Sequence, residues 1–265
     1  GDWFPNQEKL PNGIGGLAEK IEGLGLKFGL WFEPEMISPE SKLYEMHPDW
    51  CIHAEGRERN LGRQQLILDL TRQDVQDYLY DSIADILKTG MISYVKWDFN
   101  RNMAEVGSAL LDARRQCEIP HRYYLGLYAL LERLVTAFPD VLFESCSGGG
   151  GRFDAGMLYY MPQTWTSDNS DAIERLKIQY GTSLVYPLSA MSAHVSASPN
   201  HQTGHVTDFA TRLTVALTGS FGYELDPTAI SEEERQAIRE SAALFKELGG
   251  VLAEGDYHRL ISPYA

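Results

Sequence analysis

The sequence predicts an α/β fold built around a parallel β-sheet of six principal strands. Short β-rich runs are each followed by a loop with Gly, Asp, Ser or Asn and then by an amphipathic stretch, as in βα units. The helical stretches carry start or stop signals, such as Ser231 with Glu234 three residues later, a capping box. Several strands end in polar or acidic residues, at the edge where parallel sheets place their active sites.

Local sequence bounds each element in turn. The first helix spans residues 14–24 because Gly25 breaks it, and Gly90 follows the end of the second. The remaining helices are expected at residues 74–88, 123–137, 172–180, 208–217 and 232–248. Apolar or β-branched runs predict strands at residues 26–33, 93–98, 141–145, 164–166, 184–189 and 220–224.

Between the first two strands, residues 36–70 form a long excursion with an extra hairpin, whose clearest strand is 65–70. Six strands fit two architectures. One is part of a closed (β/α)8 TIM barrel, which needs eight strands, and the other is an open doubly wound sheet. Both place the active site at the carboxyl ends of the strands, so the pattern locates a site without choosing between them.

Composition limits the classes of partner. The chain has 265 residues, 43% of them hydrophobic, and a formal net charge of −14, which argues against nucleic acid and anionic membranes. No apolar run is long enough to span a bilayer, and residues 1–9 lack the apolar core of a signal peptide. The cysteines, Cys51, Cys117 and Cys146, are odd in number and lack metal-ligand spacing, which favours a reducing, cytoplasmic compartment.

The segment YVKWDFNR, residues 94–101, places an apolar strand directly before a cluster of polar groups. With a side-chain period of two, Lys96, Asp98 and Asn100 point to one side of the strand and Trp97 to the other. Such polar groups would line the mouth of a barrel, and an ion-pair cluster capping the barrel has the same pattern. Aromatic faces stack on sugars, so Trp97 and Trp31, which lie near strand ends, are either ligand contacts or core.

The segment WTSDNSD, residues 165–171, follows a short strand and leads into a helix. Asp168 could face the strand ends while Asp171 caps the helix that begins at Ala172, or both could be caps. Two carboxylates at two strand ends suit glycoside hydrolysis. One attacks the anomeric carbon, and the other protonates the leaving oxygen and later activates water.

Two further segments admit other chemistry. Four glycines in ESCSGGGGRFD, residues 144–154, match neither G-x-G-x-x-G nor a P-loop, so a close approach to a flat ligand such as a sugar is favoured over a phosphate cradle. A nucleophilic role for Cys146 is disfavoured because its candidate partners, His194, His201 and His205, are distant in sequence. No acidic residue accompanies these histidines, which favours a binding or structural loop over a metal site.

Five blocks together resemble the bacterial α-galactosidases of glycoside hydrolase family 36. They are WFEPEM at 31–36, KWDFNR at 96–101, SCSGGG at 145–150, WTSDN at 165–169 and PNHQTG at 199–204. They occur in the order of the family and cover nearly the whole chain. The resemblance implies an incomplete (β/α)8 TIM barrel, a retaining mechanism, and a requirement for neither a cofactor nor a metal.

The resemblance assigns Asp98 as the nucleophile and Asp168 as the general acid/base. It also implies substrate contacts from Trp31, Arg63, Lys96, Asn100, Cys146 and Gly149. The implied reaction releases terminal α-linked galactose from small galactosides of the raffinose and melibiose type by double displacement. A homotetramer is the implied assembly of the full-length protein.

The sequence also departs from the family pattern. The β-sandwich domain before the barrel, the β domain after it and the paired-Asp segment of the second strand have no counterpart, and His205 stands where we expect Arg in most relatives. We therefore expect residues 1–265 to form a single partial barrel with about six of its eight βα units. The alternatives are an inactive or non-catalytic galactoside-binding fragment, a transglycosidase and an α-N-acetylgalactosaminidase on the same scaffold.

Overall fold

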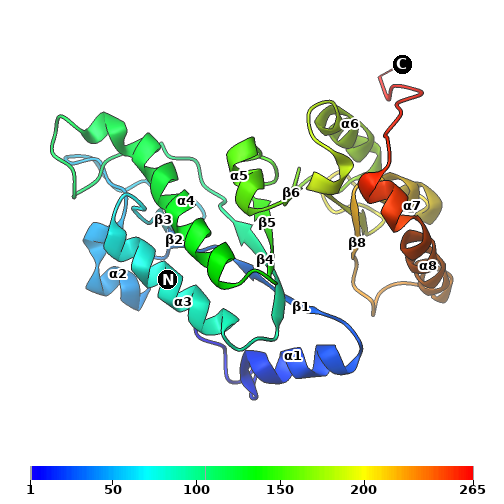
Figure 1. Cartoon of the computed structure of the whole chain (residues 1–265), viewed down its shortest axis with the longest axis horizontal. Helices are drawn as coiled ribbons and strands as arrows, with labels where there is room; N and C mark the ends of the chain where they lie inside the picture. The colour runs from blue at the N-terminus through cyan, green and yellow to red at the C-terminus, as the bar shows by residue number, and fades with distance from the viewer. Residues whose placement is uncertain (1, 105, 265) are drawn as a thin grey trace. The chain divides into compact units, whose positions relative to one another are not determined.

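The computed structural model describes residues 2–104 and 106–264. Within them, six strands form one sheet in the order β1-β4-β5-β6-β7-β8 (Figure 1). They are β1 (Phe28–Phe32), β4 (Ile92–Asp98), β5 (Leu142–Cys146), β6 (Gln163–Trp165), β7 (Met191–Ser196) and β8 (Ser220–Glu224). The pairs β1–β4, β6–β7 and β7–β8 are parallel. A doubly wound sheet reverses its strand order at a switch point, and this order never reverses, so the fold is that of an incomplete TIM-type barrel.

The six predicted helices are present, with their ends within six residues of the predicted bounds. In chain order the helices are α1 (Gly13–Gly23), α2 (Lys42–Met46), α3 (Gln73–Leu87), α4 (Ile119–Ala137), α5 (Ala155–Tyr160), α6 (Ala172–Ser183), α7 (Phe209–Ala216) and α8 (Glu232–Glu254). The predicted hairpin is present as the antiparallel pair β2 (Met36–Ile37) and β3 (Leu66–Ile67). The short helices α2 and α5 were not predicted, because each spans little more than one turn and has no clear apolar period.

One predicted strand is wrong. Residues 184–189 were expected to be a strand, but they form turns and the start of a 3-10 helix at Leu188–Ala190, and the strand β7 begins only at Met191. The physical reason is Pro187, which has no N–H to donate to a central ladder. His194 consequently lies on β7 and not in the loop that follows it.

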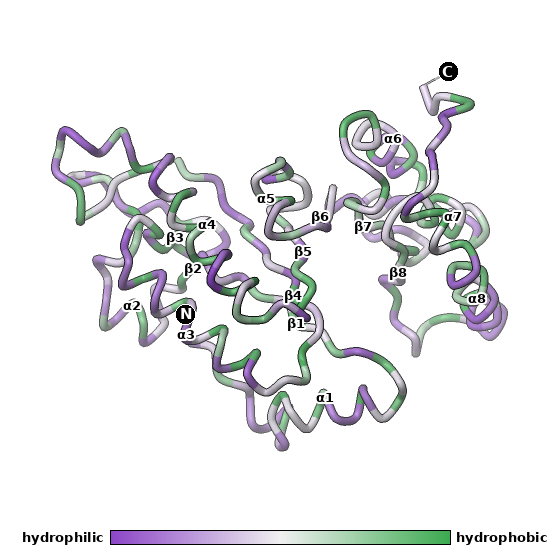
Figure 2. The backbone as a smooth tube through the Cα atoms, viewed as in Figure 1, coloured by the Kyte–Doolittle hydropathy of each residue, from purple (hydrophilic) through white to green (hydrophobic). Residues whose placement is uncertain are grey.

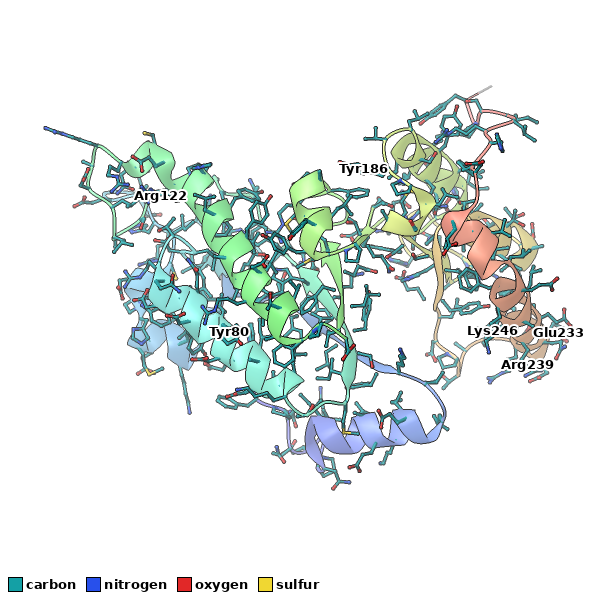
Figure 3. The ribbon with its side chains drawn as sticks, in the orientation of Figure 1. Tyr80, Arg122, Tyr186, Glu233, Arg239 and Lys246 are labelled. Carbon is teal, nitrogen blue, oxygen red and sulfur yellow. The ribbon has the colours of Figure 1, made fainter. Side chains whose placement is uncertain are left out.

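The chain forms two compact units, with the boundary between Glu144 and Ser145 inside β5. In the first unit, α3 packs against α4, and their inward faces bury leucines and isoleucines such as Leu79, Ile83 and Leu127 (Figure 1). The apolar period on these helices produces that shared face. Arg133 of α4 stacks on Tyr80 of α3, which is labelled in Figure 3, with its guanidinium carbon 4.1 Å from the ring centroid.

The second unit is centred on β7, whose Met191, Ala193 and Val195 are fully buried. Helix α8 begins at the predicted capping box, in which Ser231 accepts from the Glu234 N–H and Glu234 accepts from the Ser231 N–H. Three of its charged residues, Glu233, Arg239 and Lys246, are exposed (Figure 3).

The amphipathic character of the helices is visible along the backbone. Hydrophilic and hydrophobic residues alternate along α1, and the outer stretch of α8 is largely hydrophilic (Figure 2). In the part of the chain that the structure describes, no helix is both long enough and apolar enough to cross a membrane. Amphipathic helices with one polar face are what a sheet covered by helices requires.

Candidate active site

Asp98 is the last residue of β4, and three donors hold its carboxylate. Trp31 Nε1 donates to Asp98 Oδ2 at 3.2 Å, and Asn100 Nδ2 donates to the same oxygen at 2.5 Å. The backbone N–H of Phe99 donates to Oδ1 at 2.9 Å. Because Asp98 is only 6% exposed and both of its oxygens accept hydrogen bonds, the carboxylate has one fixed orientation.

The alternation along β4 separates polar from packing side chains as predicted. Trp97 is fully buried and donates through Nε1 to Glu35 Oε1 at 2.8 Å, so it belongs to the core. Trp31 is 52% exposed, and its backbone lies in register with Lys96 on the neighbouring strand. Of the two tryptophans that the sequence left undecided, only Trp31 is available to a ligand.

Glu33 connects Asp98 to the excursion after β1. Its Oε1 accepts from Asn100 Nδ2 at 2.8 Å and forms an ion pair with Arg63 Nη1 at 3.5 Å. We name Trp31, Glu33, Asp98 and Asn100 the Asp98 cluster. Sequence reasoning did not assign Glu33 to the site, although its position two residues after Trp31 on an alternating strand was a usable signal.

Arg63 lies at the edge of this cluster. Its side chain is 59% exposed, and its backbone has φ of 52°, followed by 60° at Gln64. Two successive left-handed residues other than glycine form a tight turn, which mutual backbone hydrogen bonds between Gly62 and Gln65 close. The turn brings the guanidinium of Arg63 to Glu33. The sequence gave no indication of this contact, because the two residues are far apart in the chain.

Lys96 pairs with a buried acid. Its Nζ lies 3.4 Å from Glu144 Oε1, and the Glu144 side chain is 1% exposed. Glu144 ends the part of β5 that belongs to the first unit. The resemblance implied a substrate contact for Lys96, and this ion pair adds Glu144 as a partner that the sequence did not suggest.

A second buried carboxylate supports the strand that carries Asp98. Glu35 is fully buried, and its Oε2 accepts from the Tyr123 hydroxyl at 2.6 Å while its Oε1 accepts from Trp97. These bonds join the turn before β2, the indole preceding Asp98 and helix α4. A buried carboxylate bound by two donors is rigid, so Glu35 holds β4 in place.

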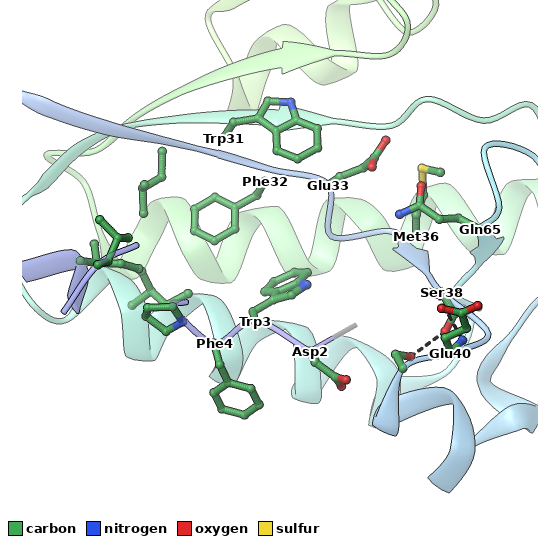
Figure 4. A pocket seen from close by; sticks show the side chains of 16 residues that line it. Asp2, Trp3, Phe4, Trp31, Phe32, Glu33, Met36, Ser38, Glu40 and Gln65 are labelled. Carbon is green, nitrogen blue, oxygen red and sulfur yellow. Dashed lines mark hydrogen bonds between the residues drawn. The ribbon is translucent and has the colours of Figure 1, made fainter. Parts of the chain in front are cut away.

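A pocket of about 590 Å³ adjoins the Asp98 cluster within the first unit. The side chains of Trp31 and Glu33 point to one side of the chain, and the side chain of Phe32 points to the other (Figure 4). There the ring of Phe32 packs against that of Trp3, with ring centroids 5.7 Å apart. Asp2 accepts from the N–H groups of Lys42 and Leu43 and so caps α2. The pocket walls are mainly aromatic and aliphatic, with Glu33 as the link to the cluster.

In the second unit, the two aspartates after β6 have separate roles. Asp171 caps α6, since its Oδ1 accepts from the N–H groups of Ile173 at 2.8 Å and Glu174 at 3.1 Å. Asp168 is exposed and lies outside the cap, in the loop of residues 166–170 that we name the Asp168 loop. The alternative in which both aspartates are helix caps is therefore wrong.

The glycine-rich segment packs directly against the Asp168 loop. The Gly150 N–H donates to the Thr166 carbonyl at 3.0 Å. Gly149 has φ of 85°, and a Cβ there would lie 2.7 Å from Ser167 Cα and 2.9 Å from the backbone N of Asp168. The glycines are thus required by the approach of two backbones, which the sequence had interpreted as an approach to a ligand. Cys146, at the end of β5, is 2% exposed.

The loop after β7 reaches the same region of the second unit. Thr203 Oγ1 donates to Asp171 Oδ2 at 2.6 Å, and His205 Nδ1 lies 2.9 Å from that oxygen. Burial raises the pKa of Asp171, but the hydrogen bonds from Thr203, Glu174 and Ile173 and the nearby His205 outweigh it, so the pKa lies below its usual value. This loop therefore supports the helix cap. The sequence had favoured a binding or structural loop over a metal site.

The predicted site residues divide between the two units. Trp31, Arg63, Lys96, Asp98 and Asn100 lie in the first unit, and Cys146, Gly149 and Asp168 lie in the second. In the first unit, hydrogen bonds join Trp31 and Asn100 to Asp98 within the Asp98 cluster. In the second, Gly149 contacts the backbone of Asp168. Among residues 2–104 and 106–264, no group of three or more His, Cys, Asp or Glu side chains could hold a metal ion.

Known proteins are similar to this chain in sequence and in fold. Alpha-galactosidase AgaA of Geobacillus stearothermophilus is 58% identical over 264 residues, which cover 100% of this chain and 36% of that protein. The crystal structure of AgaA superposes with a TM-score of 0.98 at 57% identity and covers 100% of this chain and 37% of that chain. A variant of AgaA in complex with raffinose gives a TM-score of 0.97 at 57% identity, covering 99% and 37%.

These similarities concern one part of longer proteins, since the chain spans about a third of the length of AgaA. The match to the solved structures extends along the strands of both units and agrees with the TIM-type strand order. A family profile described as Melibiase matches residues 1–255. The chain therefore belongs to the melibiase family, with the glycoside hydrolase family 36 α-galactosidases as its close relatives.

Proposed function

We propose that the protein carrying this chain is a retaining glycoside hydrolase that releases terminal α-linked galactose. The observation that carries the proposal is the Asp98 carboxylate, which is buried at a strand end and held by Trp31, Asn100 and the Phe99 N–H. A carboxylate that attacks carbon must be held in one orientation and shielded from bulk water. The α-galactosidase activity named for its relative AgaA supplies the class of substrate.

The proposed reaction has two steps. An oxygen of Asp98 bonds to the anomeric carbon while the bond to the glycosidic oxygen breaks, and Asp168 gives that oxygen a proton. Water then loses a proton to Asp168 and attacks the anomeric carbon, which breaks the bond to Asp98. Two inversions restore the starting configuration, so the first product is α-galactose.

The other predicted residues supply binding in this proposal. The half-exposed indole of Trp31 offers a flat apolar face to the sugar ring, and Lys96 and Asn100 offer polar groups to its hydroxyl groups. Arg63 lies at the edge of the Asp98 cluster, where it would meet the sugar or the group leaving it. Gly149 lies beside the Asp168 loop, and Cys146 ends the strand β5 three residues before it.

We propose small galactosides of the raffinose and melibiose type as substrates, because a variant of AgaA was crystallised with raffinose. No cofactor or metal takes part in the proposed steps, since both proton transfer and nucleophilic attack are assigned to carboxylates. A homotetramer is proposed on the resemblance to the family. A cytoplasmic location is proposed because Cys51, Cys117 and Cys146 are all free thiols and Cys117 is exposed.

Turnover of an aryl α-galactoside by Asp98→Ala and Asp168→Ala variants tests the proposal. The protein used should contain residues 1–265 together with any further sequence that its gene encodes. We expect each variant to lose at least about a hundredfold in kcat, and proton NMR of the wild-type reaction to show α-galactose first. Near-normal turnover by both variants, or β-galactose as the first product, would rule the mechanism out.

The same assay separates the alternative functions. A high concentration of an acceptor sugar would yield mainly transfer products from a transglycosidase, and an α-N-acetylgalactosaminidase would prefer the acetamido substrate. Calorimetry with galactose addresses the non-catalytic alternative. Binding without turnover would favour a galactoside-binding module, which lacks the bond-breaking step that the geometry of Asp98 supports.

A further inference from the structure

Arg175 is a buried arginine that none of the sequence motifs singled out. It lies in the second turn of α6, is 2% exposed, and follows Asp168 by seven residues. Side chains on a helix tilt toward its N-terminus, so an arginine at this position reaches back over the loop that precedes the helix. The loop it reaches is the Asp168 loop.

The guanidinium of Arg175 binds three oxygens of that loop. Nη1 donates to Thr166 Oγ1 at 2.8 Å, Nη2 donates to the Ser167 carbonyl at 2.6 Å, and Nε donates to the Asn169 carbonyl at 2.9 Å. Ser167 and Asn169 are the two neighbours of Asp168 in the chain. Because their carbonyls bind to one rigid planar group, the backbone on both sides of Asp168 is fixed.

Two further contacts hold this arrangement. The guanidinium carbon of Arg175 lies 4.2 Å from the ring centroid of Trp165, which ends β6, so the arginine is held by an aromatic face as well as by oxygens. From another side, Gly149 and Gly150 press against Ser167 and Thr166. The loop is therefore clamped between helix α6 and the glycine-rich segment.

We propose that Arg175 is a positioning residue that sets the location of the Asp168 carboxyl for proton transfer. The inference rests on the proposed function, in which Asp168 is the acid/base. An acid that must reach a glycosidic oxygen works only within hydrogen-bond distance, so a small shift of the loop reduces proton transfer before it affects sugar binding. Arg175 itself touches neither substrate nor reacting atoms in this proposal.

The proposal predicts a dependence on the leaving group. A 2,4-dinitrophenolate departs without protonation, whereas a phenolate or a sugar alkoxide needs a proton from Asp168 as its bond to carbon breaks. Displacement of the acid should therefore lower the rate on substrates with poor leaving groups and leave the rate on substrates with good leaving groups nearly unchanged. A general loss of folded protein would instead lower the rates on all substrates by the same factor.

Arg175→Lys is the informative variant, because it keeps the charge but loses the planar fork that binds three oxygens. We expect kcat/KM on phenyl α-galactoside and on raffinose to fall about ten- to hundredfold, and on 2,4-dinitrophenyl α-galactoside less than about threefold. Thr166→Val removes one of the three acceptors without altering the arginine. It should show the same selectivity with a smaller effect.

Arg212→Lys is the matched control. Arg212 is 5% exposed in the same unit and donates to the carbonyls of Ser196 and Thr207 and to Glu234, so its replacement also removes a buried fork. Any loss in this variant should be equal for both classes of leaving group. If Arg175→Lys and Thr166→Val also gave equal losses, or no loss, the positioning role would be wrong.

Asp168→Ala, measured in the same series, separates the two proposals. If this variant loses activity selectively on poor leaving groups while both Arg175→Lys and Thr166→Val do not, then Asp168 is the acid and only the role of Arg175 fails. If Asp168→Ala shows no such selectivity, the proposed acid/base itself is wrong. Selective losses in all three variants support both proposals.

Discussion

Trp31 of β1 donates its indole N–H to the carboxylate of Asp98 on the next strand of the sheet, at 3.2 Å. The two residues are 67 positions apart in sequence, and the parallel register of β1 and β4 brings them together. A half-exposed ring thus has two uses, one as a donor to Asp98 and the other as an apolar surface for a sugar. The two uses can be separated by substitution.

Trp31→Phe keeps an aromatic face and removes the donor to Asp98. We expect kcat/KM on an aryl α-galactoside to fall about tenfold, as for the loss of one hydrogen bond, with little change in Tm because the ring is half exposed. Steady-state kinetics and thermal unfolding measure both effects. Trp3→Phe, in another wall of the same pocket, is the control, and an equal loss there would show that the effect is not due to the bond to Asp98.

Glu35→Gln tests the buried support of β4. Trp97 and Tyr123 donate to different oxygens of Glu35, and the amide of glutamine would replace one of these acceptors by an NH2 donor. We therefore expect a loss of about 1–3 kcal/mol in the free energy of unfolding. Urea denaturation measures this loss. Glu40→Gln, at an exposed acid five residues further along the chain, should change stability by less than about 0.5 kcal/mol. Equal effects from the two substitutions would contradict a special role for Glu35.

Gly149→Ala tests the contact between the glycine-rich segment and the Asp168 loop. The new Cβ would meet Ser167 Cα at 2.7 Å, and the φ of 85° is unfavourable for alanine, so we expect a destabilisation of about 1–3 kcal/mol and a fall in kcat. Calorimetry and kinetics measure the two effects. Gly181→Ala in α6 meets nothing within 4 Å and should stabilise by up to about 1 kcal/mol. A Gly149→Ala protein with wild-type stability would show that the loop has room for a Cβ.

The Asp171 cap should produce a dependence of stability on pH. Its pKa in the folded protein is lowered from the model-peptide value of 3.8, so its charge stabilises the fold above that value, and the stabilisation is lost as pH falls through the lowered pKa. Asp171→Asn keeps a capping oxygen and removes the charge. The difference in Tm between wild type and variant should be largest near neutral pH and should shrink toward pH values below about 3. A difference independent of pH would exclude the charge as its cause.

Much of the fold could be predicted because local signals and tertiary structure agree. Five of the six strands, the capping box at Ser231 and the cap at Asp171 follow from residue patterns that act over a few positions. The strand expected at 184–189 was misplaced because its apolar run was weighed above Pro187, which excludes it from a central ladder. The choice between barrel and doubly wound sheet needed the strand order, which local patterns do not contain.

The candidate site was predicted less completely. Alternation along β4 indicated Asp98 and Asn100, since that signal is local. The bonds of Glu33, Glu35 and Arg175 depend on which elements meet in space, and a glutamate or arginine in sequence does not reveal its partners. Gly149 was assigned to a ligand, and its backbone contact with the Asp168 loop is a second reason for glycine at that position.

The proposed mechanism requires Asp98 to form a covalent bond to the sugar. Asp168→Ala, mixed with 2,4-dinitrophenyl α-galactoside, should complete the first step without an acid and stall at the second for want of a base, so that the galactosyl-enzyme accumulates. Mass spectrometry of a proteolytic digest measures it directly. We predict one galactosyl group on the peptide that contains Asp98 and none after Asp98→Ala is added to the variant. A label on another residue, or the same label without Asp98, would contradict the mechanism.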